Sequence, residues 1–312
     1  MADVTKIATR EGYGKALVEL GAEHENLVVL DADLAGATKT AVFKKAFPDR
    51  HFDCGIAEAN MMCVAAGLAT TGLVPFASSF AMFAAGRAFE QVRNSIGYPH
   101  LNVKIGATHG GISVGEDGAS HQCCEDFALM RSIPGMVVMS PADVVEANAM
   151  TKAAYAYEGP VYMRFGRSAV PVVHGEDFTF QIGKGEALRD GSDVAIIANG
   201  LLVYEAVAAA EELAAKGINA MVINMATIKP LDEELVLAAA KKCGKVITCE
   251  EHSIIGGLGE AVCSLLAEKL PTKVVRIGIN DEFGHSGPAG ALLKQFGLSA
   301  EHIAQTAAAL CR

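Results

Sequence analysis

The sequence predicts an α/β protein with two domains, each a mostly parallel sheet with helices on both faces. Short runs rich in β-branched residues alternate with longer segments of helical periodicity, the pattern of parallel strands covered by helices. The 312 residues are enough for two domains of roughly 100–200 residues each. A polar segment without helical period, residues 172–193, interrupts the alternation. We therefore expect a first domain at 1–172, a linker at 173–192 and a second domain at 193–312.

Each element is expected from its local pattern. In the first domain, strands are expected at 26–32, 101–108, 136–140 and 160–165, and helices at 57–70, 81–96 and 143–157. The last of these helices starts at Asp143, where a carboxylate suits a helix N-terminus. In the second domain, strands are expected at 194–200, 220–224, 245–250 and 273–279, and helices at 202–216, 232–242, 257–269 and 299–310.

Composition and charge argue against several classes of protein. The chain is 51% hydrophobic and 20% charged, as globular proteins are. A formal net charge of −10 and the lack of any Lys/Arg run argue against binding to nucleic acid or to an anionic membrane. No uninterrupted apolar stretch reaches the length of about 18 residues that a membrane helix needs. Eight scattered cysteines form no CxxC pair, so we expect reduced thiols and a cytoplasmic protein.

Glu58 stands at the start of an almost entirely apolar helical segment that follows the run HFDCGI. One interpretation is that its carboxylate only interacts with the helix dipole. The other interpretation is functional. At the edge of such an apolar helix a carboxylate is expected to be partly buried, and buried carboxyls with altered pKa values concentrate in functional sites.

Two phenylalanines and two arginines are further candidates. Phe80 and Phe83 are three residues apart and share a helical face, either as core side chains or as an aromatic wall for a flat heterocycle. Arg164 and Arg167 follow a predicted strand in MRFGR. They are either solvated or able to clamp a phosphate group.

The most informative stretch is THGGISVGEDGASHQ, residues 108–122. It follows a predicted strand, and ligands bind at the carboxyl ends of strands in open α/β sheets. His109, Glu116, Asp117 and His121 lie among four glycines, which suits close backbone approach to a ligand and proton transfer near neutral pH. A flexible surface loop is the alternative. The histidines are too far apart for a zinc motif, and no metal site is expected on this chain.

Together these segments resemble the pyrimidine-binding and C-terminal domains of transketolase over nearly the whole chain. The resemblance is carried by TREGYGKAL, DADLAGATK, GIAEAN, THGGISVGEDGASHQ, KPLDEELV and EEHSIIGGLGEAV. The loop at 108–122 is the most specific of them. The last two segments are also similar to deoxyxylulose phosphate synthase.

The resemblance implies a role for each candidate residue. Glu58 would be catalytic and would hydrogen-bond the pyrimidine ring of thiamine diphosphate. Further cofactor contacts are implied at Phe80, Phe83 and Asp33. Substrate contacts are implied at His109, Asp117, His121 and Arg164, with His121 also catalytic and Arg167 the second choice for phosphate.

The chain also departs from the family. Ala84, Ala85 and Gly86 stand where a further aromatic group is often found. The GDG motif with a later asparagine, which in the family holds the diphosphate and a divalent metal, has no clean match here. The chain resembles the second chain of two-chain transketolases. That resemblance implies an N-terminal partner subunit carrying the diphosphate site and Mg²⁺ or Ca²⁺, in an assembly with two copies of each chain.

The implied function is that of a C-terminal transketolase subunit, which transfers a two-carbon ketol unit between sugar phosphates in the pentose phosphate pathway. Three alternatives stay open. A 2-oxo acid dehydrogenase beta subunit should lack GEDGASHQ, and deoxyxylulose phosphate synthase carries its diphosphate domain on the same chain. A non-catalytic subunit that kept the fold is the third. The sequence does not identify the sugars, and a sulfonated or deoxy sugar is compatible with it.

Overall fold

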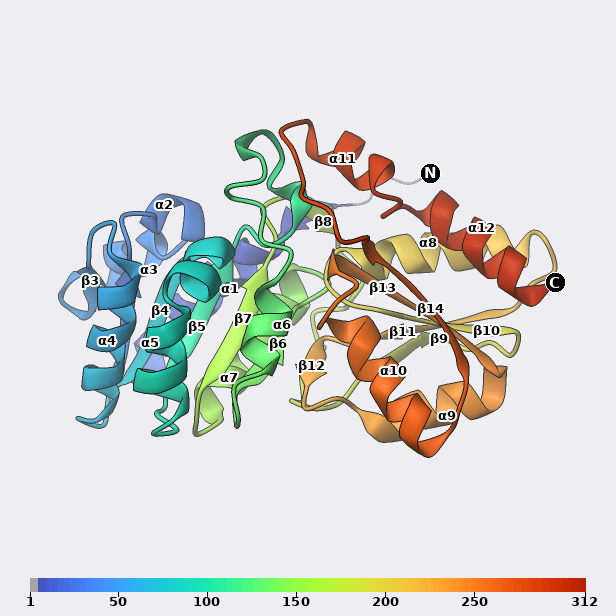
Figure 1. Ribbon diagram of the computed structural model, residues 1–312. Coiled ribbons are helices and arrows are strands. Elements are labelled where there is room, and N and C mark those ends of the chain that lie inside the picture. Colours follow the sequence, from blue (N-terminus) through green and yellow to red (C-terminus); the bar gives the residue numbers. More distant parts are fainter. Residues whose placement is uncertain (1–4) are drawn as a thin grey trace.

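The computed structural model describes residues 5–312 as two α/β domains side by side (Figure 1). The first four residues of the predicted first domain lie outside the described residues. The first domain runs from blue to green in Figure 1, and the second from yellow to red. Both are built on mostly parallel sheets with packed helices, so the predicted fold class is confirmed.

The larger sheet has seven strands in the order β12-β6-β7-β5-β4-β2-β3, and all neighbours are parallel except β12 with β6. The first domain supplies β2 (Leu27–Asp31), β3 (His51–Asp53), β4 (Val74–Phe80), β5 (Lys104–Thr108), β6 (Val137–Met139) and β7 (Val161–Phe165). Its α-helices are α1 (Thr9–Glu23), α2 (Ala35–Thr38), α3 (Ala41–Ala46), α4 (Glu58–Ala69), α5 (Phe89–Gln91), α6 (Asp126–Arg131) and α7 (Val144–Ala156). The short strands β1 (Lys6–Ala8) and β8 (Ala169–Pro171) pair antiparallel beside this sheet.

Helices cover both faces of the larger sheet, as alternation along β2 shows. Leu27 and Val29 enter the core cluster that includes α1, α3 and α7, whereas Val28 and Leu30 enter the cluster that includes α4 and α6. Because successive side chains of a strand point to opposite faces, a strand buried on both faces must be apolar throughout. This is why the strand could be predicted from a continuous apolar run.

The second sheet has five strands in the order β14-β13-β10-β11-β9, with only β9 antiparallel to its neighbour. Its strands are β9 (Glu186–Arg189), β10 (Val194–Ala198), β11 (Ala220–Asn224), β13 (Lys245–Ser253) and β14 (Lys273–Ile279). The helices are α8 (Leu202–Ala214), α9 (Glu233–Cys243), α10 (Leu258–Lys269), α11 (Ala289–Gln295) and α12 (Ala300–Cys311). In Figure 1, α11 lies across the top of the junction, beside the first domain.

The structure differs from the sequence predictions in several segments. Phe80 is the last residue of the strand β4, so the prediction that Phe80 and Phe83 share a helical face is wrong. The helix expected at 81–96 is instead two π-helical stretches, η2 (Met82–Arg87) and η3 (Val92–Gly97), on either side of α5. The polar segment expected to be irregular contains the edge strand β9, in which two residues are exposed and two are partly exposed. An exposed edge strand needs no apolar alternation, so its sequence gave no strand signal. The π-helical turns matter for the site, because they change which side chains share a helix face.

The two domains share a strand and a core. The strand β12 (Thr227–Lys229) follows the second domain's β11 in the chain, yet pairs with β6 of the first domain through Thr227 and Lys229. One core cluster contains Met130 and Tyr162 of the first domain together with Ile228 and Leu258. The relative position of the domains is therefore set by a sheet edge and by apolar packing.

A polar cluster around His174 also joins the domains. His174 Nδ1 lies 2.9 Å from Asp143 Oδ2, and its Nε2 lies 3.0 Å from Glu186 Oε2. Asn224 Nδ2 donates to both carboxylate oxygens of Glu146, at 2.9 and 3.0 Å. Burial alone lowers the pKa of His174, but the hydrogen bond to Asp143 and the charges of Glu146, Asp143 and Glu186 raise it to about 9.

Replacing His174 with Gln should remove a pH-dependent part of the stability. The pKa of His174 rises from 6.5 to about 9 on folding, so its contribution is complete below pH 6.5 and is lost as pH rises through 9. The upper limit of this contribution is roughly 3 kcal/mol, from the size of the pKa shift. Urea unfolding of both proteins between pH 6 and 9.5 measures it. A difference in unfolding free energy that stays constant with pH would contradict this account.

Candidate active site

The candidate residues gather at one edge of the larger sheet. The strands β2, β4 and β5 are parallel neighbours, so their carboxyl ends meet at the same edge. Asp33 follows β2, Phe80 ends β4, and His109 follows β5. Glu58 begins α4, which packs against β4. The topology therefore brings together residues that are up to 76 positions apart, counting from Asp33 to His109.

Glu58 is almost completely buried, with 1% of its side chain exposed. Its Oε2 accepts a hydrogen bond from Arg87 Nη1 at 2.8 Å, while Ser79 Oγ approaches Oε1 only at 3.5 Å. Met61 and Met62 of the same helix are fully buried. The location of Glu58 in the first helical turn fits the helix-dipole interpretation. That interpretation does not explain why the carboxylate is buried and paired with Arg87 of η2. One carboxylate oxygen keeps room for a further donor.

Aromatic rings line the space next to Glu58. The rings of Phe80 and Phe83 stack with centroids 5.8 Å apart, and Phe80 also stacks on His109 at 3.9 Å. His121 meets Phe83 edge-on at 5.3 Å. Stacked and edge-on contacts at these distances are favourable for aromatic pairs. The rings therefore link the Glu58 position to the loop at 108–122.

Arg87 is a site residue that the sequence analysis missed. Its guanidinium lies 4.4 Å above the Phe83 ring while it pairs with Glu58. Phe83 and Arg87 both lie in η2, four residues apart, and Ala84 and Ala85 of the same turn are buried. A cationic guanidinium thus stands close to where the family often has a further aromatic group. The available signal in the sequence was the four-residue spacing from Phe83 to Arg87, which places both side chains on one helix face.

A cluster of positive charge lies on the other side of Phe80. Arg10 Nη1 is 3.2 Å from His109 Nε2 and donates to Ala37 O at 2.9 Å. Burial, and then the charges of Arg10, Arg167 and His121, lower the pKa of His109 to about 3. His109 is therefore neutral at physiological pH, and the two arginines carry the positive charge. Such a group suits a bound anion.

Arg10 was also missed from the sequence, although it lies in the quoted segment TREGYGKAL. It stands in the first turn of α1, far from the loop in sequence, and only the fold brings it to His109. Isolated arginines on helices are common on protein surfaces. The sequence pattern therefore could not separate Arg10 from a solvated side chain.

The polar residues of the loop at 108–122 differ in how far they are exposed to solvent. Arg167 Nη1 donates to Val114 O and to Glu116 Oε2, the latter at 3.0 Å. Glu116 and Asp117 are exposed on the outer turn, and His121 is half-buried with Nδ1 3.0 Å from Ser120 Oγ. Asp117 is thus exposed to solvent, whereas His121 packs edge-on against Phe80 and Phe83.

Arg164 and Asp33 do not lie as the sequence analysis expected. Arg164 is buried, and its Nη2 donates to Cys123 O at 2.8 Å and to Glu251 O at 2.9 Å. Its Nε lies 3.2 Å from Asp126 Oδ2, so its donors serve the protein interior. The structure therefore favours Arg167 for an anion. Asp33 is exposed with a φ of +62°, and its backbone N–H donates to Asp53.

Among residues 5–312 no group of three or more His, Cys, Asp or Glu side chains could hold a metal ion. Within the same residues, no helix combines the length and apolarity needed to cross a membrane.

Known proteins match both domains of this chain. The pyrimidine-binding domain of transketolase matches residues 5–173, and the transketolase C-terminal domain matches residues 183–303. A Methanocaldococcus jannaschii protein named as a transketolase C-terminal section is 55% identical over 95% of this chain and 94% of its own. A 6-deoxy-6-sulfo-D-fructose transketolase subunit from Clostridium sp. (strain MSTE9) is 43% identical over 96% of this chain and 92% of its own.

A solved structure described as a split-gene transketolase, inactive beta4 tetramer, is similar with a TM-score of 0.91 and 54% identity. The match covers 98% of this chain and all of that one. The two matched domains define a protein of the transketolase class, whose first domain is named for pyrimidine binding. The chain belongs to the transketolase family, and within it to the C-terminal subunits of split transketolases.

His109 should stay neutral across the physiological range. Burial and the Arg10 charge hold its pKa near 3, so its ring carbon resonances in NMR spectra of ¹³C-histidine-labelled protein should not shift between pH 5 and 8. Replacing Arg10 with Ala removes one of the charges and should raise that pKa. Titration of His109 near its ordinary value of 6.5 in the unmodified protein would contradict the arrangement.

Proposed function

We propose that this chain is the C-terminal subunit of a thiamine-diphosphate-dependent transketolase. The reaction is the transfer of a two-carbon ketol unit from a ketose phosphate to an aldose acceptor. The observation that carries the proposal is the buried Glu58 carboxylate, which opens onto stacked phenylalanines beside a cationic cluster. The sugar phosphates and eight free cysteines fit a cytoplasmic role in pentose phosphate metabolism.

The residues present fit the pyrimidine half of thiamine diphosphate. Glu58 Oε1 has only the distant Ser79 hydroxyl, at 3.5 Å, and can accept a ring N–H. Phe80 and Phe83 offer aromatic faces for a flat heterocycle, with Asp33 at the same edge. When bound, thiamine diphosphate supplies the electron sink for cleaving the bond next to a carbonyl group. Glu58 would orient the pyrimidine and would hold or release a proton at Oε1.

The substrate follows from the chemistry of the remaining groups. Arg10, Arg167 and neutral His109 would bind the anionic end of the sugar, because guanidinium groups pair with tetrahedral oxyanions by two parallel hydrogen bonds. Exposed Asp117 would accept from a sugar hydroxyl, and His121 would move a proton near the reacting oxygens. A phosphate and a sulfonate share this recognition chemistry, and one similar subunit is named for a sulfonated fructose.

A partner chain would complete the site. The family's diphosphate and metal motif has no clean match in this sequence, so we place thiamine diphosphate's diphosphate and its Mg²⁺ or Ca²⁺ on an N-terminal subunit. Apolar side chains are exposed beside Glu58, with Ile56 77%, Phe52 42% and Val64 38% accessible. Exposed apolar groups next to an incomplete site are typical of an interaction surface. Two copies of each chain would then form the assembly.

Replacing Glu58 with Gln should lower turnover by at least about 100-fold, because a positioned proton-transfer group contributes that much or more. Turnover is measured with the partner subunit, thiamine diphosphate, Mg²⁺, a ketose phosphate and an aldose. Glu90→Gln is the matched control, because Glu90 is exposed and bonds only its neighbours Gln91 and Asn94. Full activity of Glu58→Gln would refute the assigned role, and full activity of this chain alone would refute the need for a partner.

Replacing Arg167 with Ala should raise the KM for a phosphorylated donor by about 10–100-fold, the loss expected for hydrogen bonds to a charged group. The KM for the same ketose without phosphate should change much less. Arg93→Ala is the matched control, because Arg93 is an exposed arginine whose side chain bonds only Asn94. Equal effects on both donors would mean that Arg167 does not bind the phosphate.

A further inference from the structure

The loop at 108–122 lies against the second domain as well as the first. Gln122 is buried at the end of this loop, and its Nε2 donates to Ile112 O at 3.2 Å and Gly115 O at 3.3 Å. The same nitrogen donates to His285 O of the second domain at 3.0 Å. The helical turn η4 (Ile112–Asp117) of the loop also packs on α11. The second domain therefore supports the loop from outside.

Glu251 reaches from the second domain into the backbone of this loop. It lies in β13, is buried, and accepts a hydrogen bond from Ser113 N–H at 2.5 Å through Oε1. A side chain at Gly111 would place its Cβ 2.2 Å from Glu251 Cδ, and Gly111 has a φ of +80°. A Cβ at Gly110 would lie 1.9 Å from Arg164 Nε. The two consecutive glycines are thus required by the side chains that press against them.

We infer that Glu251 is a positioning residue for the substrate loop: through its carboxylate the second domain holds the segment that carries His109, Asp117 and His121. The inference rests on the proposed function for the identity of the substrate, but not for the contact itself. The Ser113 N–H is buried, and a carboxylate acceptor gives it a stronger hydrogen bond than a neutral group would. Without that acceptor the amide stays unsatisfied or the loop moves to expose it.

The surroundings of Glu251 support this role. Burial raises its pKa to about 7, while the charge of Arg164 and the bonds to Ser113 lower it. Near neutral pH the protonated and ionised forms are both present, so a Gln in its place, which keeps one acceptor oxygen, should retain part of the support. An Ala removes the acceptor completely. The pair of variants therefore separates loss of the hydrogen bond from loss of charge.

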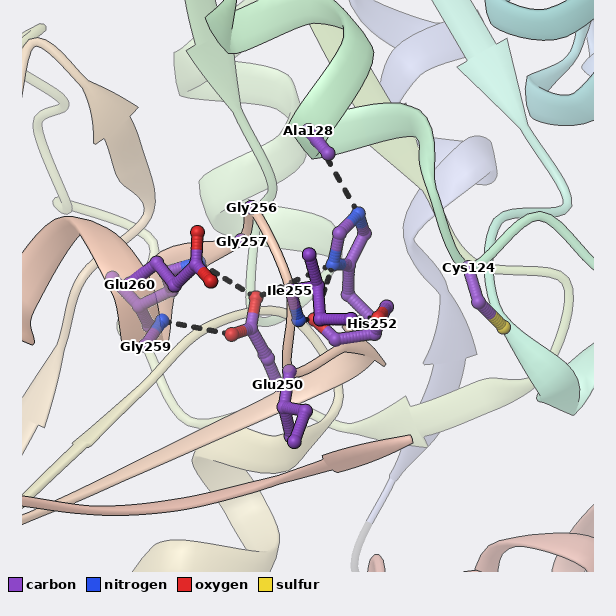
Figure 2. A network of polar contacts seen from close by, with 12 residues as sticks. Cys124, Ala128, Glu250, His252, Ile255, Gly256, Gly257, Gly259 and Glu260 are labelled. Atoms are coloured by element: carbon purple, nitrogen blue, oxygen red, sulfur yellow. Dashed lines mark hydrogen bonds and ion pairs between the residues drawn. The ribbon is translucent and has the colours of Figure 1, made fainter. Parts of the chain in front are cut away.

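Glu250 provides a matched control on the same strand. Successive strand residues point to opposite faces, and Glu250 turns to the start of α10, where it accepts from Leu258 N–H at 2.7 Å and Gly259 N–H at 2.8 Å. Figure 2 shows this carboxylate directed toward Gly259. Like Glu251 it is buried and has a pKa raised to about 7 by burial. Replacing Glu250 therefore shows the effect of losing a buried carboxylate that does not contact the loop.

Hydrogen exchange on the full chain tests the contact without any need for activity. The Ser113 amide should exchange at least about tenfold faster in Glu251→Ala than in the unmodified chain, in line with losing a hydrogen bond to a charged acceptor. Glu251→Gln should fall between them, and Glu250→Ala should leave this amide unchanged. If Glu251→Ala does not fold, the comparison of Glu251→Gln with Glu250→Gln decides. Unchanged exchange at Ser113 in both Glu251 variants would overturn the inference.

Kinetics of the assembly with its partner subunit test the consequence. Glu251→Ala should raise the donor KM about tenfold, with Glu251→Gln in between, because the loop carries the groups that bind the donor. Thiamine diphosphate affinity, followed by near-ultraviolet circular dichroism, should fall much less than donor affinity, since Glu58 is held by Ser79 and Arg87, which lie outside the loop. An equal loss of cofactor affinity, or an unchanged donor KM, would overturn the positioning role. An inactive unmodified assembly would refute the proposed function, while the exchange measurement would still decide the inference.

Discussion

Arg164 is buried where the two domains meet, and the arrangement of the site depends on the charges around it. Burial alone would lower the pKa of Arg164, but the charges of Asp126 and Glu251 raise it. The side chain also binds two backbone carbonyls, one in each domain. Removing one member of a buried ion pair leaves an uncompensated charge, at a cost of about 3–5 kcal/mol. This constraint fixes the base of the substrate loop against the second domain.

The candidate site is thus assembled by two kinds of geometry. Parallel strands bring Glu58, Phe80 and His109 to one sheet edge through ordinary topology. Two side chains then shape the loop: Arg164 packs against Gly110, and Glu251 of the second domain packs against Gly111. The second domain supplies none of the predicted ligand contacts, yet it bonds the loop between and beside the two histidines, at Ser113 and Gln122. The packing between the two domains therefore affects the candidate site at the edge of the larger sheet.

Much of this architecture could be predicted from the sequence, because strands buried on both faces must be apolar and helices between them carry a clear period. The loop at 108–122 was recognisable for a similar reason, since a dense mixture of glycine and ionisable residues has few purely structural explanations. The functions of Arg164 and Arg10 could not be predicted. Both are arginines near strand or helix ends, and only the tertiary fold shows that Arg164 is enclosed while Arg10 faces His109. Arg87 was missed because only the tertiary fold brings it to Glu58, which lies 29 positions earlier in the chain.

The shared strand β12 has a consequence for how the polypeptide can be divided. β12 covers the outer edge of β6, and it is encoded more than 50 residues after the first domain's last sheet strand, β7. A fragment that stopped at the linker would leave β6 as an open edge with unpaired backbone groups. Open edges of that kind recruit strands from other chains and promote aggregation. Dividing this polypeptide between its domains would therefore separate β6 from the strand that protects its edge.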